Sequence, residues 1–281
     1  MARELIPHPD LRVGGVESPL DHLAVRPREL EHALGEVARA VLVDQGEGRV
    51  ALVTGGSRGL GRSICKVLAR EGARVAFTYA TNDDDANATL AFLRDAGARV
   101  SAHKVSVLDK AGLTALVKQL DAEHGKVDVL VNNAGFGQVV PLALMEESDW
   151  DQMLDTHVKG AFLATQAVLR TMVREKFGRV INVSSLAGVK MMQAPVHYAT
   201  AKAALIGFTE SLAKEVGRYG ITVNAIAPGI LDEGVSAHLP PARLEEYLRH
   251  CSLKRMGTLD EASEFVAFIA SNRSAYMNGS T

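Results

Sequence analysis

From Arg49 onward, short apolar runs alternate with longer stretches in which apolar residues recur at helical spacing. The runs predict strands, at 50–53, 74–79, 99–105, 127–131, 179–183 and 221–226, and the near-continuous apolar run at 127–131 is typical of a strand buried on both faces. The longer stretches predict helices, at 83–95, 109–124, 148–175 with Ser148 as N-cap, around Tyr198, and at 243–250 and 260–271. This alternation predicts an α/β fold, a doubly wound parallel (Rossmann) sheet flanked by helices, in a single domain at 49–281.

The first 48 residues follow a different pattern and are predicted to form an N-terminal arm. Prolines at positions 7, 9, 19 and 27 interrupt any long element. A short helix is expected after Pro27, because apolar residues recur at helical spacing at Leu30, Leu34, Val37 and Val41. Its apolar stripe needs a partner, either the main domain or a neighbouring subunit, and the sequence does not choose between them.

Composition narrows the classes of function. The chain of 281 residues is 47% hydrophobic with a formal charge of −2, which argues against nucleic-acid or membrane-surface partners. Its two cysteines, Cys65 and Cys251, lie far apart without a metal-ligand pattern, so we expect no metal site and a reduced compartment. Without an apolar leader or a membrane-length run, a cytoplasmic protein is expected.

A glycine-rich segment follows the first predicted strand directly and precedes a helical stretch. It reads Thr54-Gly55-Gly56-Ser57-Arg58-Gly59-Leu60-Gly61. Glycines allow close approach of a ligand to the backbone, and the start of the helix offers N–H groups to a phosphate. The segment therefore predicts a dinucleotide-binding loop, with a plain glycine turn as the alternative.

The residues at the end of the second strand bear on the choice of cofactor. An acid there would bind a ribose 2′-hydroxyl and select NAD, whereas a 2′-phosphate prefers small polar groups and a nearby arginine. The segment from Tyr79 through Thr81 to Asn82 has no acid, and Arg58 could supply the charge. We therefore expect NADPH, with NADH as a possibility; the alternative is that Arg58 is a solvated surface residue.

Tyr198 and Lys202 lie four residues apart and would share one helix face. A lysine below the phenol would lower its pKa and make it a proton donor near neutral pH. Ser185, at the end of the preceding strand, could hydrogen-bond a substrate carbonyl. For Tyr198 and Lys202 taken alone, the alternative is an ordinary amphipathic helix. For Ser185 taken alone, the alternative is a serine that only forms a turn.

Together these motifs resemble the short-chain dehydrogenase/reductase family over roughly residues 49–279. The resemblance rests on the glycine loop, Asn132-Asn133-Ala134-Gly135, Ser185, Tyr198-x-x-x-Lys202 and Pro228-Gly229, in the family's order and spacing. Among members, the chain looks most like 3-oxoacyl-carrier-protein reductases and polyketide ketoreductases. The resemblance implies that Tyr198 protonates the carbonyl oxygen, Lys202 supports it and binds the cofactor ribose, and Ser185 polarises the carbonyl. It also implies a set of cofactor contacts: Gly55, Ser57, Arg58, Gly59, Leu60, Gly61, Tyr79, Thr81, Ser106, Val107, Asn133, Ala134, Gly135, Tyr198, Lys202 and Leu231.

Several positions depart from the family pattern. His157 replaces the asparagine that holds a proton-relaying water, so a slower or more pH-sensitive relay through a histidine that charges near pH 6 to 7 is one expectation. The other is that His157 only fills space. Ser106 stands where an aspartate commonly meets the adenine, and Glu233 where a threonine commonly faces the nicotinamide. The family's final strand is apparently missing after residue 281.

The function expected from the resemblance is hydride transfer from NADPH to a ketone, with a small-molecule or acyl-carrier-bound ketone, 3-oxoacyl or polyketide-like, as substrate. Oxidation of a small alcohol, sugar or steroid with NAD(P) is an alternative, as is a cofactor-binding scaffold with little turnover. Family members also lead us to expect a homo-tetramer or homo-dimer.

Overall fold

The computed structural model describes residues 43–44, 47–234 and 241–281. These residues all belong to one compact unit that spans residues 38–281. The short helix predicted after Pro27 lies outside the described residues. Of the predicted arm, the described part forms a small antiparallel pair, β1 (Val43–Asp44) and β2 (Glu47–Gly48), directly before the main sheet.

The core is a six-stranded parallel sheet with the strand order β5-β4-β3-β6-β7-β8. Its strands are β3 (Val50–Thr54), β4 (Arg74–Tyr79), β5 (Val100–Lys104), β6 (Val129–Asn132), β7 (Gly178–Val183) and β8 (Ile221–Ile226). All six predicted strands and the Rossmann fold are confirmed. The strand order reverses between β3 and β6, and ligands of such sheets bind at the carboxyl ends of the strands on either side of this point.

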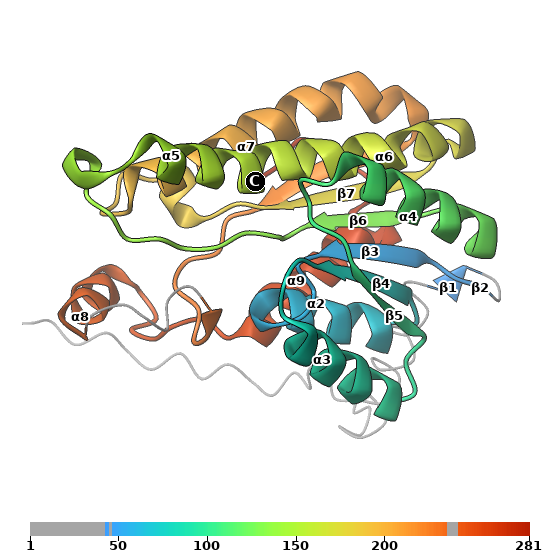
Figure 1. The fold of residues 1–281 in the computed structure, drawn as a ribbon, viewed down its shortest axis with the longest axis horizontal. Coiled ribbons are helices and arrows are strands. Elements are labelled where there is room, and N and C mark those ends of the chain that lie inside the picture. Colours follow the sequence, from blue (N-terminus) through green and yellow to red (C-terminus); the bar gives the residue numbers. More distant parts are fainter. Residues whose placement is uncertain (1–42, 45–46, 235–240) are drawn as a thin grey trace, which may run out of the picture. The chain divides into compact units, whose positions relative to one another are not determined.

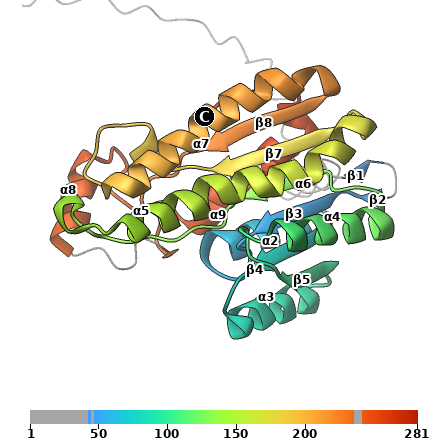
Figure 2. The same cartoon turned by 45° about the horizontal axis from the view of Figure 1, so that its top comes forward.

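Helices cover both faces of the sheet (Figures 1 and 2). On one face, α2 (Gly59–Arg70), α3 (Asp83–Asp95) and α9 (Leu259–Ala270) surround a buried cluster that includes Phe77 and Val131. On the other, α4 (Lys110–His124), α6 (Gly160–Glu175) and α7 (Val196–Val216) pack over Leu52 and Leu130. Neighbouring positions of one strand, such as Leu130 and Val131, thus enter opposite cores, which explains the continuous apolar runs in the sequence.

The long helix predicted over 148–175 is interrupted. It consists of α5 (Glu147–Leu154), a π-helical turn (Asp155–Lys159) and α6. Its N-cap is Glu146 in a capping box with Asp149, so the prediction of Ser148 was wrong. In this capping box the carboxylate of Asp149, three residues on, accepts from Glu146 N at 3.1 Å. The π-helical turn is centred on His157.

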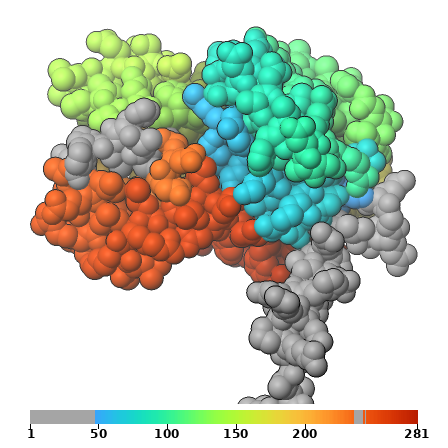
Figure 3. Space-filling model, turned by 90° about the horizontal axis from the view of Figure 1, so that it is seen from below, coloured from blue at the N-terminus to red at the C-terminus, as the bar shows by residue number. Residues whose placement is uncertain are grey.

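The last elements lie close to the first ones. Helix α8 (Pro241–His250) precedes α9, and α9 packs against α2; Figure 3 shows the red C-terminal elements beside the blue and cyan ones. At the outer edge of β8, Gly279 N donates to Val223 O (2.8 Å) and Ala225 N donates to Ser280 O (2.8 Å). The last described residues therefore continue the hydrogen bonding of the sheet. Short 3-10 turns lie at Leu142–Leu144, Leu186–Gly188, Gly217–Tyr219 and Asn272–Ser274.

Among the helices that the structure describes, none is long and apolar enough to cross a membrane.

Candidate active site

The glycine loop and the turn after β6 meet at the carboxyl edge of the sheet. The Thr54 hydroxyl accepts from Asn133 N (3.0 Å) and Ala134 N (3.1 Å) and donates to Val131 O (3.3 Å). The Asn133 side chain donates to the carbonyls of Thr54 and Gly55, both at 3.0 Å. The amide nitrogen of the Asn133 side chain therefore joins the two segments.

Two glycines of the loop are required by these close contacts. A Cβ on Gly61 would lie 2.1 Å from Gly55 O, and one on Gly55, whose φ is +68°, would lie 2.9 Å from the Ala134 Cα. Neither position has room for a side chain. The loop is thus pulled tightly against the turn after β6, as the sequence predicted for a backbone that must approach a ligand.

Helix α2 begins at Gly59 with an open N-terminus. Its N-cap, Arg58, makes no side-chain hydrogen bond to the first turn within the described chain, and that turn carries no acid. The N–H groups of the first turn therefore remain available, at the positive end of the helix dipole. This arrangement fits a pyrophosphate.

Ser185, Tyr198 and Lys202 meet at the ends of β7 and α7. The Ser185 side chain lies close enough to the Tyr198 hydroxyl to lower the pKa of the phenol. Ser185 Oγ accepts from Ala187 N (3.2 Å), which leaves its proton to donate to the phenol oxygen. Lys202 is 5% exposed; its Nζ lies 5.6 Å from the centre of the Tyr198 ring and donates to Val183 O at 2.7 Å. The structure therefore brings the predicted triad together.

The electrostatics of the triad differ from the sequence expectation. Burial raises the pKa of Tyr198, against a smaller lowering by the hydrogen bond from Ser185. Burial also lowers the pKa of Lys202 to about 7. The expectation that Lys202 lowers the pKa of the phenol is therefore wrong for this conformation, because desolvation dominates at both groups and the ammonium is directed at Val183 O.

His157, from the π-helical turn, lies against the same tyrosine. Its ring is 5.7 Å from that of Tyr198 in an edge-on arrangement. Nε2 lies 3.2 Å from Phe136 N and 3.0 Å from Phe136 O. Nδ1 is buried and has no hydrogen-bond partner among the described residues, and the ring packs on Gly135, where a Cβ would lie 2.2 Å from Cε1. His157 thus holds the turn after β6.

The structure contradicts the expectation that His157 charges near pH 6 to 7. Burial, followed by repulsion from Lys202, lowers the pKa of His157 to about 3. A neighbouring cation and an apolar setting both disfavour the imidazolium. The ring therefore stays neutral at physiological pH.

The residues predicted to contact the adenosine end lie around the ends of β4 and β5. Thr81 is exposed, and the Tyr79 hydroxyl donates to Asp83 (3.0 Å), which also pairs with Lys104 (2.7 Å). The exposed Arg58 lies 3.6 Å from Asp85. The triple acid 83–85 forms the first turn of α3, as predicted, with Asn82 as N-cap.

The remaining predicted contacts lie on either side of the crevice. Val107 is buried against Gly160, and the Ser106 hydroxyl accepts from Leu108 N at 3.2 Å. Leu231 forms an isolated bridge with Gly257, and Glu233 two residues on is exposed. This segment is held to α8, since Ile230 N donates to the hydroxyl of Tyr247 (3.2 Å).

The sequence reasoning missed three side chains beside this site, namely Gln138, Asp149 and His197. They form a connected hydrogen-bonded chain from the loop after β6 to the start of α7. His197 directly precedes Tyr198, and this adjacency was the one available signal. No pattern in the sequence distinguishes Gln138 from its loop neighbours.

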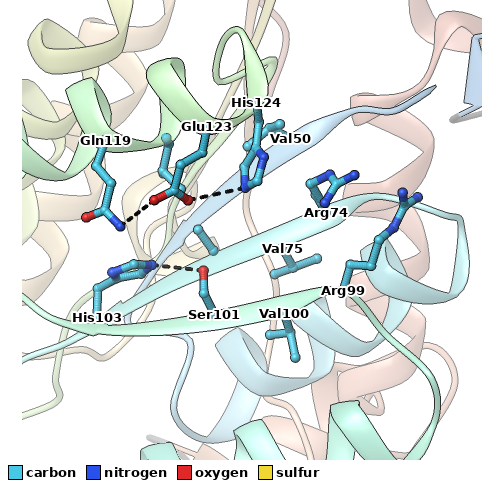
Figure 4. A pocket seen from close by; sticks show the side chains of 12 residues that line it. Val50, Arg74, Val75, Arg99, Val100, Ser101, His103, Gln119, Glu123 and His124 are labelled. Carbon is cyan, nitrogen blue, oxygen red and sulfur yellow. Dashed lines mark hydrogen bonds and ion pairs between the residues drawn. The ribbon is translucent and has the colours of Figure 1, made fainter.

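A separate pocket lies away from this edge, near the amino ends of the strands (Figure 4). Its lining includes Val50, Arg74 and Arg99 from the strand starts and Glu123 and His124 from the end of α4. Within the described chain, no group of three or more His, Cys, Asp or Glu side chains could hold a metal ion. The chemistry-bearing residues therefore gather at the carboxyl edge.

Comparison with known proteins shows the family of this chain. A family model described as short chain dehydrogenase matches residues 49–243. The chain is 38% identical over 235 residues to the 3-oxoacyl-acyl-carrier-protein reductase FabG of Escherichia coli, covering 84% of this chain and 95% of the relative. The corresponding protein of Staphylococcus aureus is 38% identical over 231 residues, covering 82% and 94%.

Solved structures give the same result. A short-chain dehydrogenase/reductase from Serratia marcescens superposes with a TM-score of 0.77 at 34% identity, over 83% of this chain and 95% of the other. A 3-oxoacyl-acyl-carrier-protein reductase from Brucella melitensis superposes with a TM-score of 0.79 at 29% identity, over 87% and 92%. With its glycine loop, its turn after β6 and its Ser185, Tyr198 and Lys202, the chain belongs to the short-chain dehydrogenase/reductase family of NAD(P)-dependent oxidoreductases.

Proposed function

We propose that this protein reduces ketones with NADPH, and that its substrates are 3-oxoacyl or polyketide-like thioesters borne on an acyl carrier. The observation that carries the proposal is the placement of Ser185, Tyr198 and Lys202 at the same sheet edge as an open glycine loop. The curated relatives of this chain include 3-oxoacyl-acyl-carrier-protein reductases, which supports the substrate class.

The loop and helix start fit a dinucleotide. The backbone from Gly55 to Gly61 and the first turn of α2 would hold the pyrophosphate, and Lys202 the nicotinamide ribose. Arg58 is the cation placed to meet a 2′-phosphate, and the end of β4 offers Tyr79 and Thr81 where an NAD-selective site would have an acid. When bound there, NADPH supplies the hydride.

The chain's own groups then handle the ketone oxygen and its proton. The Ser185 hydroxyl orients and polarises the carbonyl oxygen by a hydrogen bond. Tyr198 holds a proton at its hydroxyl and donates it to that oxygen as negative charge develops there. Lys202, directed at the phenol ring and at Val183 O, contributes positive charge below the tyrosine.

Burial keeps Tyr198 in the protonated state that carbonyl reduction requires. A phenol whose pKa is raised by burial retains its proton through the neutral range, ready to donate it to the ketone oxygen.

Exposed apolar side chains support an acyl substrate. Val139 and Leu142 lie on the loop after β6, and Val189 and Met191 on the loop after β7, all at the edge that carries the site. Burying such side chains against an aliphatic chain would stabilise binding by roughly 25 cal/mol per Å² of apolar surface. A sugar would offer little apolar surface in return.

The test is NADPH oxidation with a panel of carbonyl compounds: a 3-oxoacyl thioester on acyl carrier protein, the same acyl group on a short thiol, the free 3-oxo acid, and a keto sugar. We expect the carrier-bound thioester to give the highest kcat/KM and Tyr198→Phe to lose at least about a hundredfold in kcat. The Tyr198→Phe variant should still bind NADPH, as measured by the fluorescence of the nucleotide.

Two results would contradict the proposal. Tight binding of NADPH, with no oxidation of NADPH in the presence of any of the ketones, would indicate a cofactor-binding scaffold. Higher kcat/KM for the keto sugar than for both thioesters would overturn the substrate class while leaving the reductase chemistry in place.

A further inference from the structure

A line of hydrogen bonds joins three elements beside Tyr198. Gln138 Nε2 donates to Asp149 Oδ1 at 2.6 Å, and Gln138 Oε1 lies 3.3 Å from His197 Nε2. Asp149 belongs to the first turn of α5, Gln138 to the loop after β6, and His197 to the first turn of α7. We refer to these three residues as the Asp149–Gln138–His197 chain.

The direction of each bond follows from its acceptor. Hydrogen bonds from Gln138 and from Glu146 N hold the pKa of Asp149 below its usual value, so this carboxylate only accepts. It therefore draws the amide nitrogen of Gln138 and turns the amide oxygen toward His197. Nε2 of His197 must then carry the proton and donate.

The start of α7 depends on this contact. Its N-cap, Pro195, makes no side-chain hydrogen bond in the described structure, so the first turn lacks the usual cap. His197 is fully buried in that turn and directly precedes Tyr198. Through Gln138, an ionised carboxylate on a neighbouring helix thus fixes the turn that bears the tyrosine.

The same loop is held at a second point by His157, whose Nε2 contacts the backbone of Phe136. The loop segment 136–138 is therefore attached to the π-helical turn at one end and to α7 at the other. Both attachments use a buried histidine: His157, which contacts the Tyr198 ring, and His197, which directly precedes Tyr198 in the chain. A shift of this segment would move the tyrosine relative to Ser185.

We propose that Gln138 and His197 are positioning residues that set the placement of the Tyr198 hydroxyl for proton transfer and close one side of the ketone site, an inference that rests on the proposed reductase function. Asp149 orients Gln138 by accepting its amide N–H, and through Gln138 it orients His197. Displacement of a reacting group by about 1 Å can cost on the order of a hundredfold in rate. Loss of the hydrogen bonds of the Asp149–Gln138–His197 chain should therefore lower kcat. It should not weaken the binding of NADPH, since the glycine loop is not part of this set of hydrogen bonds.

The variants are chosen to remove hydrogen bonds and keep volume. Gln138→Met removes both bonds of the amide on a half-buried loop, where misfolding is not a concern. His197→Leu removes the donor, and His197→Gln keeps an amide nitrogen near the position of Nε2. Asp149→Asn removes the charge that orients Gln138, and Asp151→Asn, an exposed acid on the same helix, is the matched control.

We expect Gln138→Met and His197→Leu each to lower kcat by about ten- to a hundredfold, with KM and Kd for NADPH changed by less than about twofold. Their double variant should lose no more than the larger single effect, because both act through one contact. His197→Gln should recover most of kcat, Asp149→Asn should lower it, and Asp151→Asn should match the parent protein. Unchanged kcat in Gln138→Met, or multiplicative losses in the double variant, would overturn the proposal.

Amide hydrogen exchange tests the positioning without turnover. In the parent protein and in Asp151→Asn we expect the hydrogen-bonded amides of Phe136 and of residues 199–201 to exchange slowly, and in Gln138→Met both sets to exchange faster together. Equal protection in Gln138→Met and the parent would overturn the inference. If the parent protein reduces no ketone, the proposed function fails. The hydrogen-exchange measurement then still decides whether the Asp149–Gln138–His197 chain has a positioning role.

Discussion

The His157 imidazole stands edge-on to the phenol ring of Tyr198, with ring centres 5.7 Å apart and planes at 87°. Lys202 lies 5.6 Å from the centre of the same phenol ring. Repulsion between His157 and Lys202 contributes to the low pKa of the imidazole, after burial. Of these two groups, Lys202 is the one whose pKa lies near neutral pH, at about 7.

Replacing His157 by asparagine should leave the shape of the pH-rate profile unchanged. The pKa of His157 is lowered to about 3, so the ring is neutral throughout the range from about pH 5 to 9 and contributes no ionisation there. The measurement is kcat/KM for the ketone in both proteins across that range. An acid limb near pH 6 to 7 that is present in the parent and absent from His157→Asn would show that the histidine does charge.

The same variant separates two roles of His157. Asparagine is shorter and loses the contact of Nε2 with Phe136, so kcat should fall by less than about tenfold through looser placement of the loop. Gly135→Ala serves as the companion variant, because its Cβ would displace the ring, and it should reduce kcat at least as much.

Replacing Lys202 by methionine should stabilise the fold, and more so at low pH. The pKa of Lys202 is about 7 in the folded protein and 10.5 as a free side chain. Below about pH 7 the lysine is charged in both states and its burial costs the fold the full amount, on the order of 3–5 kcal/mol. Between these two pKa values the unfolded chain binds more protons, so stability rises with pH and the cost disappears above about pH 10.5.

Urea unfolding at about pH 6 and pH 9 measures this difference. Lys202→Met should gain more unfolding free energy over the parent at pH 6 than at pH 9, while losing catalytic activity. Lys214→Met, at an exposed position of the same helix, should show no such pH dependence. An equal gain at both pH values would mean that the pKa of Lys202 is not lowered by folding.

How far the sequence predicts this fold depends on the kind of information each element carries. The central strands were predictable because both of their faces are buried, and the run from Val129 to Val131 shows that directly. The break at 155–159 was not, since the residues on either side keep helical spacing and a π-helical turn has no pattern of its own. The N-cap at Glu146 was missed because serine is a preferred N-cap residue and glutamate is not, so Ser148 was the stronger signal.

The residues of the site also divide into those that the sequence predicts and those that it does not. Ser185, Tyr198 and Lys202 were recognisable because their chemistry needs defined residue types at defined spacings. The pKa of Lys202 and of His157 could not be read in advance, because burial decides both and burial depends on packing from β7, α7 and the π-helical turn. The Gln138 contact joins residues 59 positions apart, and no local pattern records it.

Replacing Arg58 by alanine should weaken NADPH binding and spare NADH. The guanidinium is the exposed cation at the start of α2, and its nearest described acid is Asp85 at 3.6 Å. A charge-assisted contact to a 2′-phosphate is worth about 1.5–3 kcal/mol, so Kd for NADPH should rise about ten- to a hundredfold. Nucleotide fluorescence measures both affinities.

Asp85→Asn is the companion change. It removes the acid that competes for Arg58, and it should tighten NADPH by a few fold at low salt while leaving NADH unchanged. Equal weakening of both nucleotides by Arg58→Ala would show that the arginine supports the loop and does not recognise the phosphate.

Alanine should have opposite effects at two glycines of α2 and α7. Gly207 lies inside α7 with open space where a Cβ would stand, so Gly207→Ala should stabilise the fold by about 0.5–1 kcal/mol through helix propensity. At Gly61 the same methyl would lie 2.1 Å from Gly55 O, a backbone atom that cannot move without opening the loop. Gly61→Ala should therefore lower the melting temperature and abolish NADPH binding. Measured together by thermal unfolding and nucleotide fluorescence, the pair tests whether the close contact with Gly55 O, and not helix propensity, requires glycine at position 61. Retained NADPH affinity in Gly61→Ala would show that it does not.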